Sequence, residues 1–272
     1  MNRTIGFIGS GNMGEAMISG LIKSKTAVPD QIMVFDVDDS KMEYMNEVYG
    51  IVLKPDVISL TKDAEILVLA VKPAVYPSVI REIREVVDQN AIIITIAAGQ
   101  KLKCVERLFG RKLKVARVMP NIPALVGEAM SAVATNRLIT DEDIMQIESL
   151  LNSFGTCEKI PEDLMDSVTA VSGSSPAYIY VLIEAMADGA VQEGMPRSQA
   201  YRFAAQAVYG SAKMVLESKK HPGELKDMVC SPGGTTISAV AELERKGFRA
   251  AVLSAMAACA VRSRKMLNKE SV

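Results

Sequence analysis

The sequence contains a single histidine, His221, among 272 residues. A mechanism that pairs histidine with a nucleophile, or that binds a metal through several histidines, would have to rest on this one side chain. His221 precedes Pro222 and Gly223, which is typical of a loop. We therefore expect no catalytic role for His221, and we predict no metal site.

Cysteine is also scarce. The four cysteines are far apart in the chain, and no two of them form a CxxC pair. This spacing predicts reduced thiols that pack as small apolar side chains, as in cytosolic proteins. The chain enters an apolar strand pattern directly after Thr4, without the layout of a signal peptide. These features lead us to expect a cytoplasmic protein.

Clusters of lysine and arginine are missing, and the formal net charge is -1. Because binding to a phosphate backbone needs clustered basic residues, we expect no nucleic-acid partner. No apolar run approaches the ~20 residues that cross a bilayer, so we expect no membrane partner. A hydrophobic content of 49% and a charged content of 23% are instead typical of a globular protein with one or two domains.

In the first half of the chain, short β-branched runs alternate with helical patterns. This rhythm predicts a Rossmann domain over residues 1–160, an α/β domain with a doubly wound, mostly parallel sheet. The predicted strands are residues 4–8, 31–36, 66–71, 92–97, 114–119, 129–134 and 156–160. The predicted helices are residues 13–23, 40–49, 75–87 and 141–153.

After Pro161 only helical patterns follow, over residues 162–170, 176–194, 198–219, 222–229, 235–246 and 248–268. The last of these helices is apolar on several faces, so it needs burial on all sides. The helices of this half can hardly supply that burial alone. We therefore predict that residues 161–272 form an all-α dimerisation domain of an obligate homodimer. The alternative is a compact monomeric bundle.

A glycine-rich loop, Gly9-Ser10-Gly11-Asn12-Met13-Gly14, joins the first predicted strand to the first predicted helix. In a G-x-G-x-x-G loop the glycines permit the tight turn, the approach of a pyrophosphate and close helix–strand packing. The N–H groups that open the helix then face the phosphates. We predict a dinucleotide site that includes Gly9, Gly11, Asn12, Met13 and Gly14. The alternative is a purely structural turn.

Asp36 ends the second predicted strand, at the spacing expected for a residue that contacts the adenosine ribose. Its carboxylate can accept hydrogen bonds from the ribose hydroxyls and would repel a 2′-phosphate. Asp38 and Asp39 add negative charge, and Lys41 is the only nearby cation. This charge pattern favours NADH over NADPH.

Three further segments follow predicted parallel strands, at the sheet edge where ligands bind. We expect them to line the nicotinamide half of the site, although Lys72 could instead be a solvated lysine beside a turn. The residues are Ala70, Val71, Lys72 and Pro73, then Ala97, Ala98 and Gly99, and finally Asn121.

A second glycine-rich loop, Ser231-Pro232-Gly233-Gly234-Thr235-Thr236, opens a helix near the C-terminal end of the sequence. Its successive N–H groups can form a nest for a carboxylate, and its hydroxyls offer neutral donors and acceptors. The loop from Gly173 to Tyr178 is a similar helix start. By chemistry alone, each could be only a well-capped helix.

The segment from Leu225 to Thr236, LKDMVCSPGGTT, resembles the signature of the pyrroline-5-carboxylate reductase family. The resemblance covers nearly the whole chain and includes IGSGNMG at residues 8–14, AVKP at 70–73, MPN at 119–121 and HPG at 221–223. It implies the last step of proline synthesis, in which NAD(P)H reduces 1-pyrroline-5-carboxylate to L-proline. It also implies a Rossmann domain followed by a helical dimerisation domain, often in rings of dimers.

By this resemblance, the substrate carboxylate rests on a loop that contains Ser231, Gly233, Gly234 and Thr235. Thr236 would be the catalytic residue, with its hydroxyl beside the imine nitrogen, and Glu162 matches a substrate-side position. A protonated cyclic imine accepts hydride readily, so no histidine base, nucleophile or metal is required.

The sequence departs from the family pattern at three positions. Ser175 stands where glycine is usual, and Met228 where some members carry a polar residue that reaches the cofactor. Asp36 stands where the family often has small or basic residues. The resemblance therefore favours NADPH, whereas the charge at Asp36 favours NADH.

Two other functions are compatible with the first glycine loop. A β-hydroxyacid dehydrogenase needs a lysine in the helix of its second domain, but Ile179 stands at the matching position. A dinucleotide-binding regulatory protein without turnover is the other alternative. Cofactor oxidation in the presence of pyrroline-5-carboxylate separates all three functions.

Overall fold

The computed structural model describes residues 3–269. The chain forms two compact units. The first contains the residues up to Ser174 together with those from Cys259 onward, and the second is Ser175–Ala258. The division at residue 160 drawn from the sequence stays a prediction.

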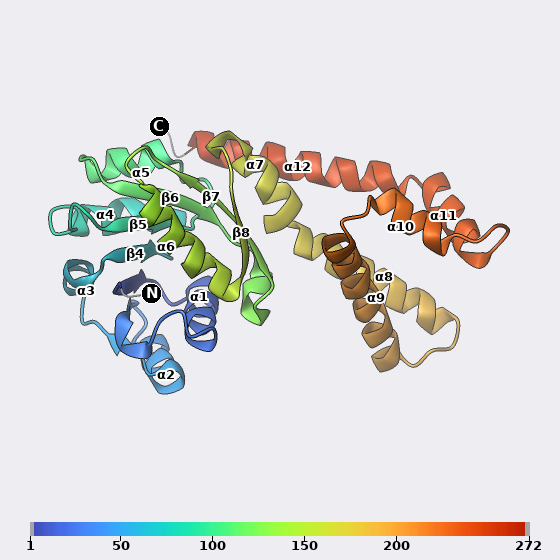
Figure 1. The fold of residues 1–272 in the computed structure, drawn as a ribbon, viewed down its shortest axis with the longest axis horizontal. Helices are drawn as coiled ribbons and strands as arrows, with labels where there is room; N and C mark the ends of the chain where they lie inside the picture. Colours follow the sequence, from blue (N-terminus) through green and yellow to red (C-terminus); the bar gives the residue numbers. More distant parts are fainter. Residues whose placement is uncertain (1–2, 270–272) are drawn as a thin grey trace. The chain divides into compact units, whose positions relative to one another are not determined.

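The first unit is built on one eight-stranded sheet, in the order β3-β2-β1-β4-β5-β6-β7-β8. Neighbouring strands are parallel except β6 and β7, which are antiparallel. The predicted doubly wound, mostly parallel sheet is therefore confirmed (Figure 1). The strands are β1 (Ile5–Ile8), β2 (Ile32–Phe35), β3 (Val52–Leu53), β4 (Ile66–Leu69), β5 (Ile92–Thr95), β6 (Lys114–Met119), β7 (Ala129–Thr135) and β8 (Gly155–Lys159).

Helices cover both faces of this sheet (Figure 1). They are α1 (Asn12–Lys23), α2 (Asp39–Tyr49), α3 (Val57–Asp63), α4 (Tyr76–Ile83), α5 (Leu102–Phe109), α6 (Asp141–Leu151) and α7 (Met165–Val168). Short helical turns join them at Pro29–Gln31, Pro73–Val75, Ile122–Val126, Asn152–Phe154, Glu162–Leu164 and, as a π-helix, Thr169–Gly173.

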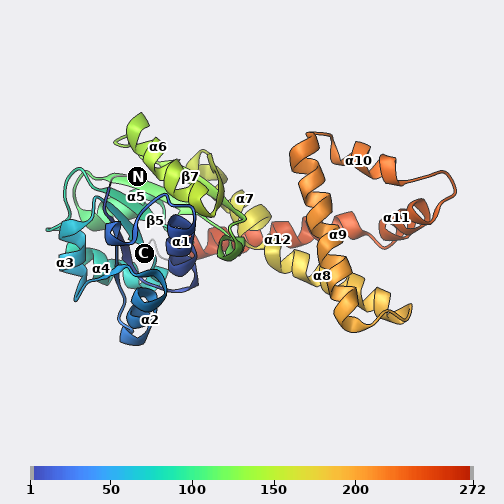
Figure 2. The ribbon, with the colours of Figure 1, turned by 60° about the horizontal axis from the view of Figure 1, so that its bottom comes forward.

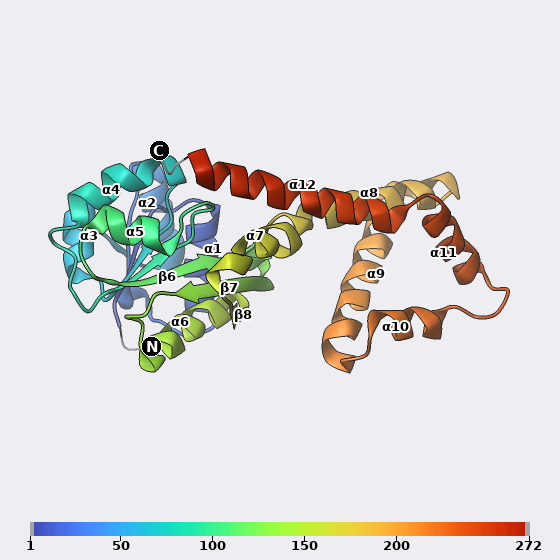
Figure 3. The same ribbon diagram turned by 90° about the horizontal axis from the view of Figure 1, so that it is seen from above.

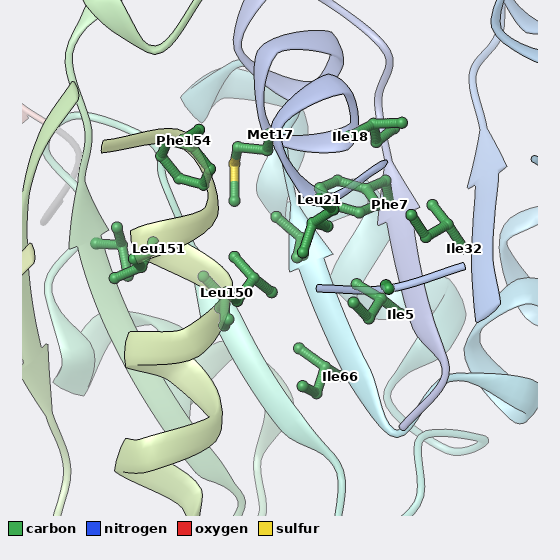
Figure 4. Packing of buried hydrophobic residues seen from close by; sticks show 14 of the residues in the cluster. Ile5, Phe7, Met17, Ile18, Leu21, Ile32, Ile66, Leu150, Leu151 and Phe154 are labelled. Atoms are coloured by element: carbon green, nitrogen blue, oxygen red, sulfur yellow. The ribbon is translucent and has the colours of Figure 1, made fainter. Parts of the chain in front are cut away.

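Alternate side chains of the strands pack into two separate cores, one on each face of the sheet. On one face, Ile5 and Phe7 pack with α1, α2 and α6, and Figure 4 shows Met17 and Leu21 of α1 next to residues of the α6 segment. On the other face, residues such as Leu67 and Ile93 pack with α3, α4 and α5. Each fully buried Leu, Ile or Phe side chain stabilises the fold by about 1.5–3 kcal/mol relative to an exposed one. These two cores hold the strand ends that carry the candidate site.

Among the strands and α-helices, three were not predicted, namely β3, α3 and α5. They are short, so periodicity within the segment is weak, and they depend on packing against neighbours for their stability. A local signal does exist for α3, because the Asp56 side chain caps it by accepting a hydrogen bond from the Ser59 N–H at 2.6 Å. The predicted helix over residues 162–170 is wrong in detail, because a 3₁₀ turn, α7 and the π-helix divide it.

The second unit is all-helical, and its helices begin and end close to the predicted positions. They are α8 (Ser175–Gln192), α9 (Arg197–Ser218), α10 (Pro222–Val229) and α11 (Thr235–Arg245), and α12 (Phe248–Lys269) starts here. Figures 2 and 3 show α9 packed against α8, followed by α10 and α11.

This helical unit has very little core of its own. Its buried hydrophobic residues are three alanines, Ala187, Ala200 and Ala204. Large apolar side chains are exposed instead, with Phe203 at 66% and Leu253 at 68% of their full exposure. Exposed apolar surface of this kind is typical of an interaction surface. Among the described residues, no helix is long and apolar enough to cross a membrane.

Candidate active site

The first glycine loop lies between β1 and α1, as predicted. Gly9 has a φ of +103°, a conformation that favours glycine, and a Cβ there would lie 2.7 Å from the Ala70 carbonyl oxygen. At Gly14 a Cβ would lie 2.6 Å from the carbonyl oxygen of Gly9. The packing of β1, α1 and the end of β4 therefore requires glycine at both positions.

Gly11 is different, because a Cβ at this position would meet no described atom within 4 Å. Gly11 is the N-cap of α1 and provides no side-chain cap to its first turn. The lack of a side chain thus leaves room over free N–H groups, which is the arrangement that a pyrophosphate needs. The residues present fit a dinucleotide.

The glycine loop opens onto a cleft of about 270 Å³. The registers of β1, β2 and β4 place Ile8, Phe35 and Leu69 side by side, so the residues after them meet at one sheet edge. Six predicted cofactor residues line this cleft, namely Gly9, Gly11, Asp36, Ala70, Val71 and Lys72. Ser10 lies beside them and is buried.

Asp36 is held firmly at the end of β2. Its Oδ2 accepts hydrogen bonds from the Ser10 N–H at 2.7 Å and from the Ser10 hydroxyl at 2.9 Å. Its Oδ1 accepts a hydrogen bond from the Asp38 N–H at 3.1 Å. Lys41 also lines the cleft, but its ammonium group lies 3.7 Å from the carboxylate of Asp38.

Tyr76, at the start of α4, connects the ends of β4 and β5. Its hydroxyl donates to the Leu69 carbonyl at 2.8 Å and lies 2.8 Å from the Thr95 hydroxyl. Burial raises the pKa of Tyr76 to about 12, so the phenol remains protonated and can donate. The loops that follow Leu69 and Thr95 are those predicted to line the nicotinamide half.

The remaining predicted cofactor residues lie outside the cleft lining. Ala98 and Gly99 line a second cavity of about 190 Å³, together with Thr169, Ser174 and Cys259. Asn121 is engaged within the protein, because its amide nitrogen donates to the Ser172 hydroxyl at 3.1 Å and its oxygen accepts from the Met130 N–H. A contact between these residues and a cofactor stays a prediction.

Glu162 has protein partners in this structure. Its Oε1 accepts hydrogen bonds from the Leu102 N–H at 2.8 Å, at the start of α5, and from the Arg117 guanidinium at 3.1 Å. Arg117 is a buried side chain of β6, only 3% exposed, and its Nε has no hydrogen-bond partner among the described residues. Glu162 therefore neutralises a buried charge, and its predicted contact with substrate remains untested.

The second glycine loop lies in the helical unit. Gly233 has a φ of +67°, and Gly234 is the N-cap of α11, without a side-chain cap. A Cβ on Gly234 would lie 2.3 Å from the Ser231 hydroxyl oxygen, so another residue here would require the exposed Ser231 side chain to turn away. Within residues 3–269, the hydroxyls of Thr235 and Thr236 make no hydrogen bond to the protein. The free N–H groups and hydroxyls are available to a carboxylate.

His221 serves as the N-cap of α10. Its Nδ1 accepts a hydrogen bond from the Gly223 N–H at 3.1 Å. Ser175 begins α8, and the Met228 side chain on α10 is exposed, with its sulfur 3.7 Å from the Lys220 ammonium nitrogen. The described residues contain no group of three or more metal-ligating side chains.

Comparison with known proteins identifies the family. The profile for pyrroline-5-carboxylate reductase dimerisation matches residues 162–266, and the profile for F420-dependent NADP oxidoreductases matches residues 4–99. The chain is 48% identical to the pyrroline-5-carboxylate reductase of Escherichia coli (strain K12), over 98% of this chain and 99% of that one. The chain belongs to the pyrroline-5-carboxylate reductase family.

Solved pyrroline-5-carboxylate reductases share the fold. The enzyme from Coxiella burnetii superimposes with a TM-score of 0.93 at 29% identity, over 98% of this chain and 99% of that chain. The Plasmodium falciparum enzyme, solved with NADP bound, gives a TM-score of 0.87 at 29% identity, over 98% of each chain. The resemblance drawn from the sequence is therefore confirmed.

Sequence reasoning missed three residues that organise the site. Ser10 lies within the glycine loop, at a position that the motif leaves unspecified. Tyr76 looks like an ordinary helix residue in the sequence. Arg117 did carry a signal, because it is a charged residue inside the apolar strand pattern KVARVM, and such a charge must be paired when buried.

Proposed function

We propose that this oxidoreductase reduces 1-pyrroline-5-carboxylate to L-proline with a nicotinamide dinucleotide. Family membership over nearly the full chain is the observation that carries the proposal. The two glycine loops support it, because each leaves an uncapped helix start at which an anion can bind. One loop suits the pyrophosphate of the cofactor, and the other suits the carboxylate of the substrate.

The proposed reaction requires little acid–base catalysis by the protein. The bound dinucleotide supplies the hydride, and a protonated imine carbon accepts it. The loop containing Ser231, Gly233 and Gly234 would hold the carboxylate through N–H and hydroxyl groups. Thr236 would orient the imine by a hydrogen bond to its nitrogen, and that nitrogen loses its positive charge as the carbon is reduced.

The cofactor-binding residues are proposed as predicted from the sequence. Gly9 to Gly14 would bind the pyrophosphate, and the ends of β4, β5 and β6 would face the nicotinamide. Lys72 lines the cleft beside the glycine loop, which supports the proposal that it contacts the cofactor.

We further propose that the enzyme prefers NADH. Asp36 lines the cleft, and the Lys41 ammonium group lies 3.7 Å from the carboxylate of Asp38. The negative charge of Asp36 would repel a 2′-phosphate, and neither Lys41 nor Lys72 of the cleft is paired with Asp36. The Plasmodium falciparum relative binds NADP in its solved structure, so this preference would distinguish the present enzyme.

The working enzyme is proposed to be a homodimer or a ring of dimers. The exposed apolar surface of the helical unit and its match to a dimerisation family support the dimer. We infer that the substrate loop of one subunit completes the cofactor site of another. A cytoplasmic location, expected from the reduced cysteines, remains a prediction.

A single assay tests the function and the cofactor preference. Purified enzyme is mixed with pyrroline-5-carboxylate and either NADH or NADPH, and cofactor oxidation and proline formation are followed. We expect oxidation in step with proline formation and a higher kcat/KM for NADH. Oxidation without proline would contradict the reaction, and a higher kcat/KM for NADPH would contradict the charge argument.

A further inference from the structure

The glycine loop and the end of β2 are joined by a contact that the G-x-G-x-x-G motif does not require. Ser10 donates to the same oxygen of Asp36 through both its backbone N–H and its hydroxyl, at 2.7 and 2.9 Å. We propose that Ser10 is a positioning residue for cofactor choice, which acts by holding the Asp36 carboxylate toward the adenosine ribose. This inference rests on the proposed preference for NADH.

The contact is well protected from water. Ser10 is only 5% exposed, so its hydroxyl has little access to competing solvent. Hydrogen bonds to a charged acceptor are stronger than neutral ones, and burial strengthens them further. The side chain of Asp36, which would otherwise rotate freely at a strand end, is thereby restricted to one orientation.

This orientation leaves acceptor capacity for a ligand. An ionised carboxylate has about four lone-pair positions. Ser10 uses two of them on Oδ2, and the Asp38 N–H uses one on Oδ1 at 3.1 Å. The remaining position on Oδ1 can accept a ribose hydroxyl. A phosphate in the same place would meet a carboxylate that cannot turn away from it.

Two lysines line the cleft with Asp36, and neither of them forms an ion pair with it. Lys41 is paired with Asp38 instead, at 3.7 Å. Lys72 lines the cleft from the end of β4 and has no ion pair with the described residues. The fixed position of Asp36 thus discriminates between the two cofactors, and loss of the Ser10 hydroxyl should weaken that discrimination.

The test is a double-mutant cycle read by binding as well as activity. The variants are Ser10→Ala, Asp36→Asn and the double mutant, and the dissociation constants of NADH and NADPH are measured by the nicotinamide fluorescence change. The chain has no tryptophan, so no protein indole contributes to that signal. Both constants are measured on one preparation, so their ratio is independent of the folded fraction.

We expect Ser10→Ala to weaken NADH binding by roughly 5- to 10-fold and to change NADPH binding by less than about 2-fold. In the Asp36→Asn background, Ser10→Ala should leave the ratio of the two constants unchanged. Ser40→Ala is the matched control, because the Ser40 hydroxyl donates to Asp38 at 2.6 Å rather than to Asp36. It should leave the ratio as in the wild type.

An equal loss of affinity for both cofactors in Ser10→Ala would overturn the role of Ser10. The role would also be overturned if Ser10→Ala changed the ratio of the two dissociation constants equally in the wild-type and Asp36→Asn backgrounds. These outcomes are separable from failure of the proposed function. If the enzyme bound NADH more tightly than NADPH but made no proline, the proposed reaction would be contradicted. The binding measurements would still test the role of Ser10.

Discussion

At the scale of single residues, the two glycine loops differ in what surrounds them. Around Gly9 to Gly14, buried side chains such as Ser10 and strand ends determine the geometry. Around Gly234, the Thr235 and Ser231 side chains are exposed, and the hydroxyl of Thr236 has no partner among the described residues. The loop from Gly9 to Gly14 is therefore preorganised by the protein, whereas the loop from Ser231 to Thr236 keeps its donors available for a ligand.

Replacement of Thr236 should therefore affect turnover more than folding. We expect Thr236→Ala to lower kcat by about 100-fold, because the imine loses a positioned hydroxyl group. Thr236→Ser keeps the hydroxyl and should retain most of kcat. Steady-state kinetics at saturating cofactor provide the measurement, and full activity of Thr236→Ala would show that this hydroxyl has no catalytic role.

Asp143 provides a test of stability rather than activity. It is 1% exposed and lies 2.8 Å from the Lys114 ammonium group and 3.4 Å from the Arg3 guanidinium. Burial alone would raise the pKa of Asp143, but hydrogen bonds from Lys114 and Thr140 outweigh it, so the pKa lies below its usual value. A lowered pKa in the folded state stabilises the fold above the unfolded pKa, near 4, and this gain is lost as the pH falls through the folded pKa.

We expect Asp143→Asn to lower the free energy of unfolding by about 2 kcal/mol at pH 7. The difference from the wild type should shrink as the pH falls from about 4 through the lower pKa of folded Asp143. The wild-type side chain is then protonated and, like asparagine, uncharged. Urea unfolding across this pH range is the measurement. The control is Asp63→Asn, which removes an exposed partner of Lys54 and should lower the free energy of unfolding by less than about 1 kcal/mol. A loss of stability in Asp143→Asn that does not change with pH would contradict the predicted role of the Asp143 charge.

At the scale of elements, the buried phenol of Tyr76 connects the carboxyl ends of β4 and β5. Tyr76 reaches the Leu69 carbonyl and the Thr95 hydroxyl from the first turn of α4. The chain around Tyr76 is otherwise an amphipathic helix, so its sequence predicts burial but not the contact with β5. The pairing depends on strand order, which brings β4 and β5 side by side.

Tyr76→Phe should lower the free energy of unfolding by about 1–3 kcal/mol, because the buried Thr95 hydroxyl loses its partner. Tyr44→Phe is the control, since the Tyr44 side chain is exposed and its hydroxyl donates to Glu15 at 3.1 Å. Thermal and urea unfolding of both variants make the comparison. Equal stability of Tyr76→Phe and the wild type would show that the phenol does not hold the two strand ends together.

At the scale of the whole molecule, the helical unit cannot account for its own stability. Its fully buried hydrophobic residues are alanines, which bury little apolar area. The alternative of a compact monomeric bundle requires a core that this unit lacks. The proposed association with a second copy would supply that burial, in agreement with the dimerisation family that residues 162–266 match.

A charge placed on this apolar surface should separate the subunits. We expect Phe203→Asp with Leu253→Asp to give monomers that bind NADH but do not make proline, because a charged side chain opposes burial. Size-exclusion chromatography, NADH binding and turnover are measured together. Met145→Asp, at an exposed methionine of the first unit, should stay dimeric and active, and active monomers of the double variant would contradict the inference.

The sequence by itself determined the α/β class, most helix and strand positions, both glycine loops and the family. Each of these depends on periodicity or on motifs within a short stretch of chain, where neighbours in sequence are neighbours in space. The tertiary structure decided the contacts of Ser10 with Asp36, of Tyr76 with Thr95 and of Arg117 with Glu162. Their partners are brought together by strand order and by burial, which a local pattern does not encode.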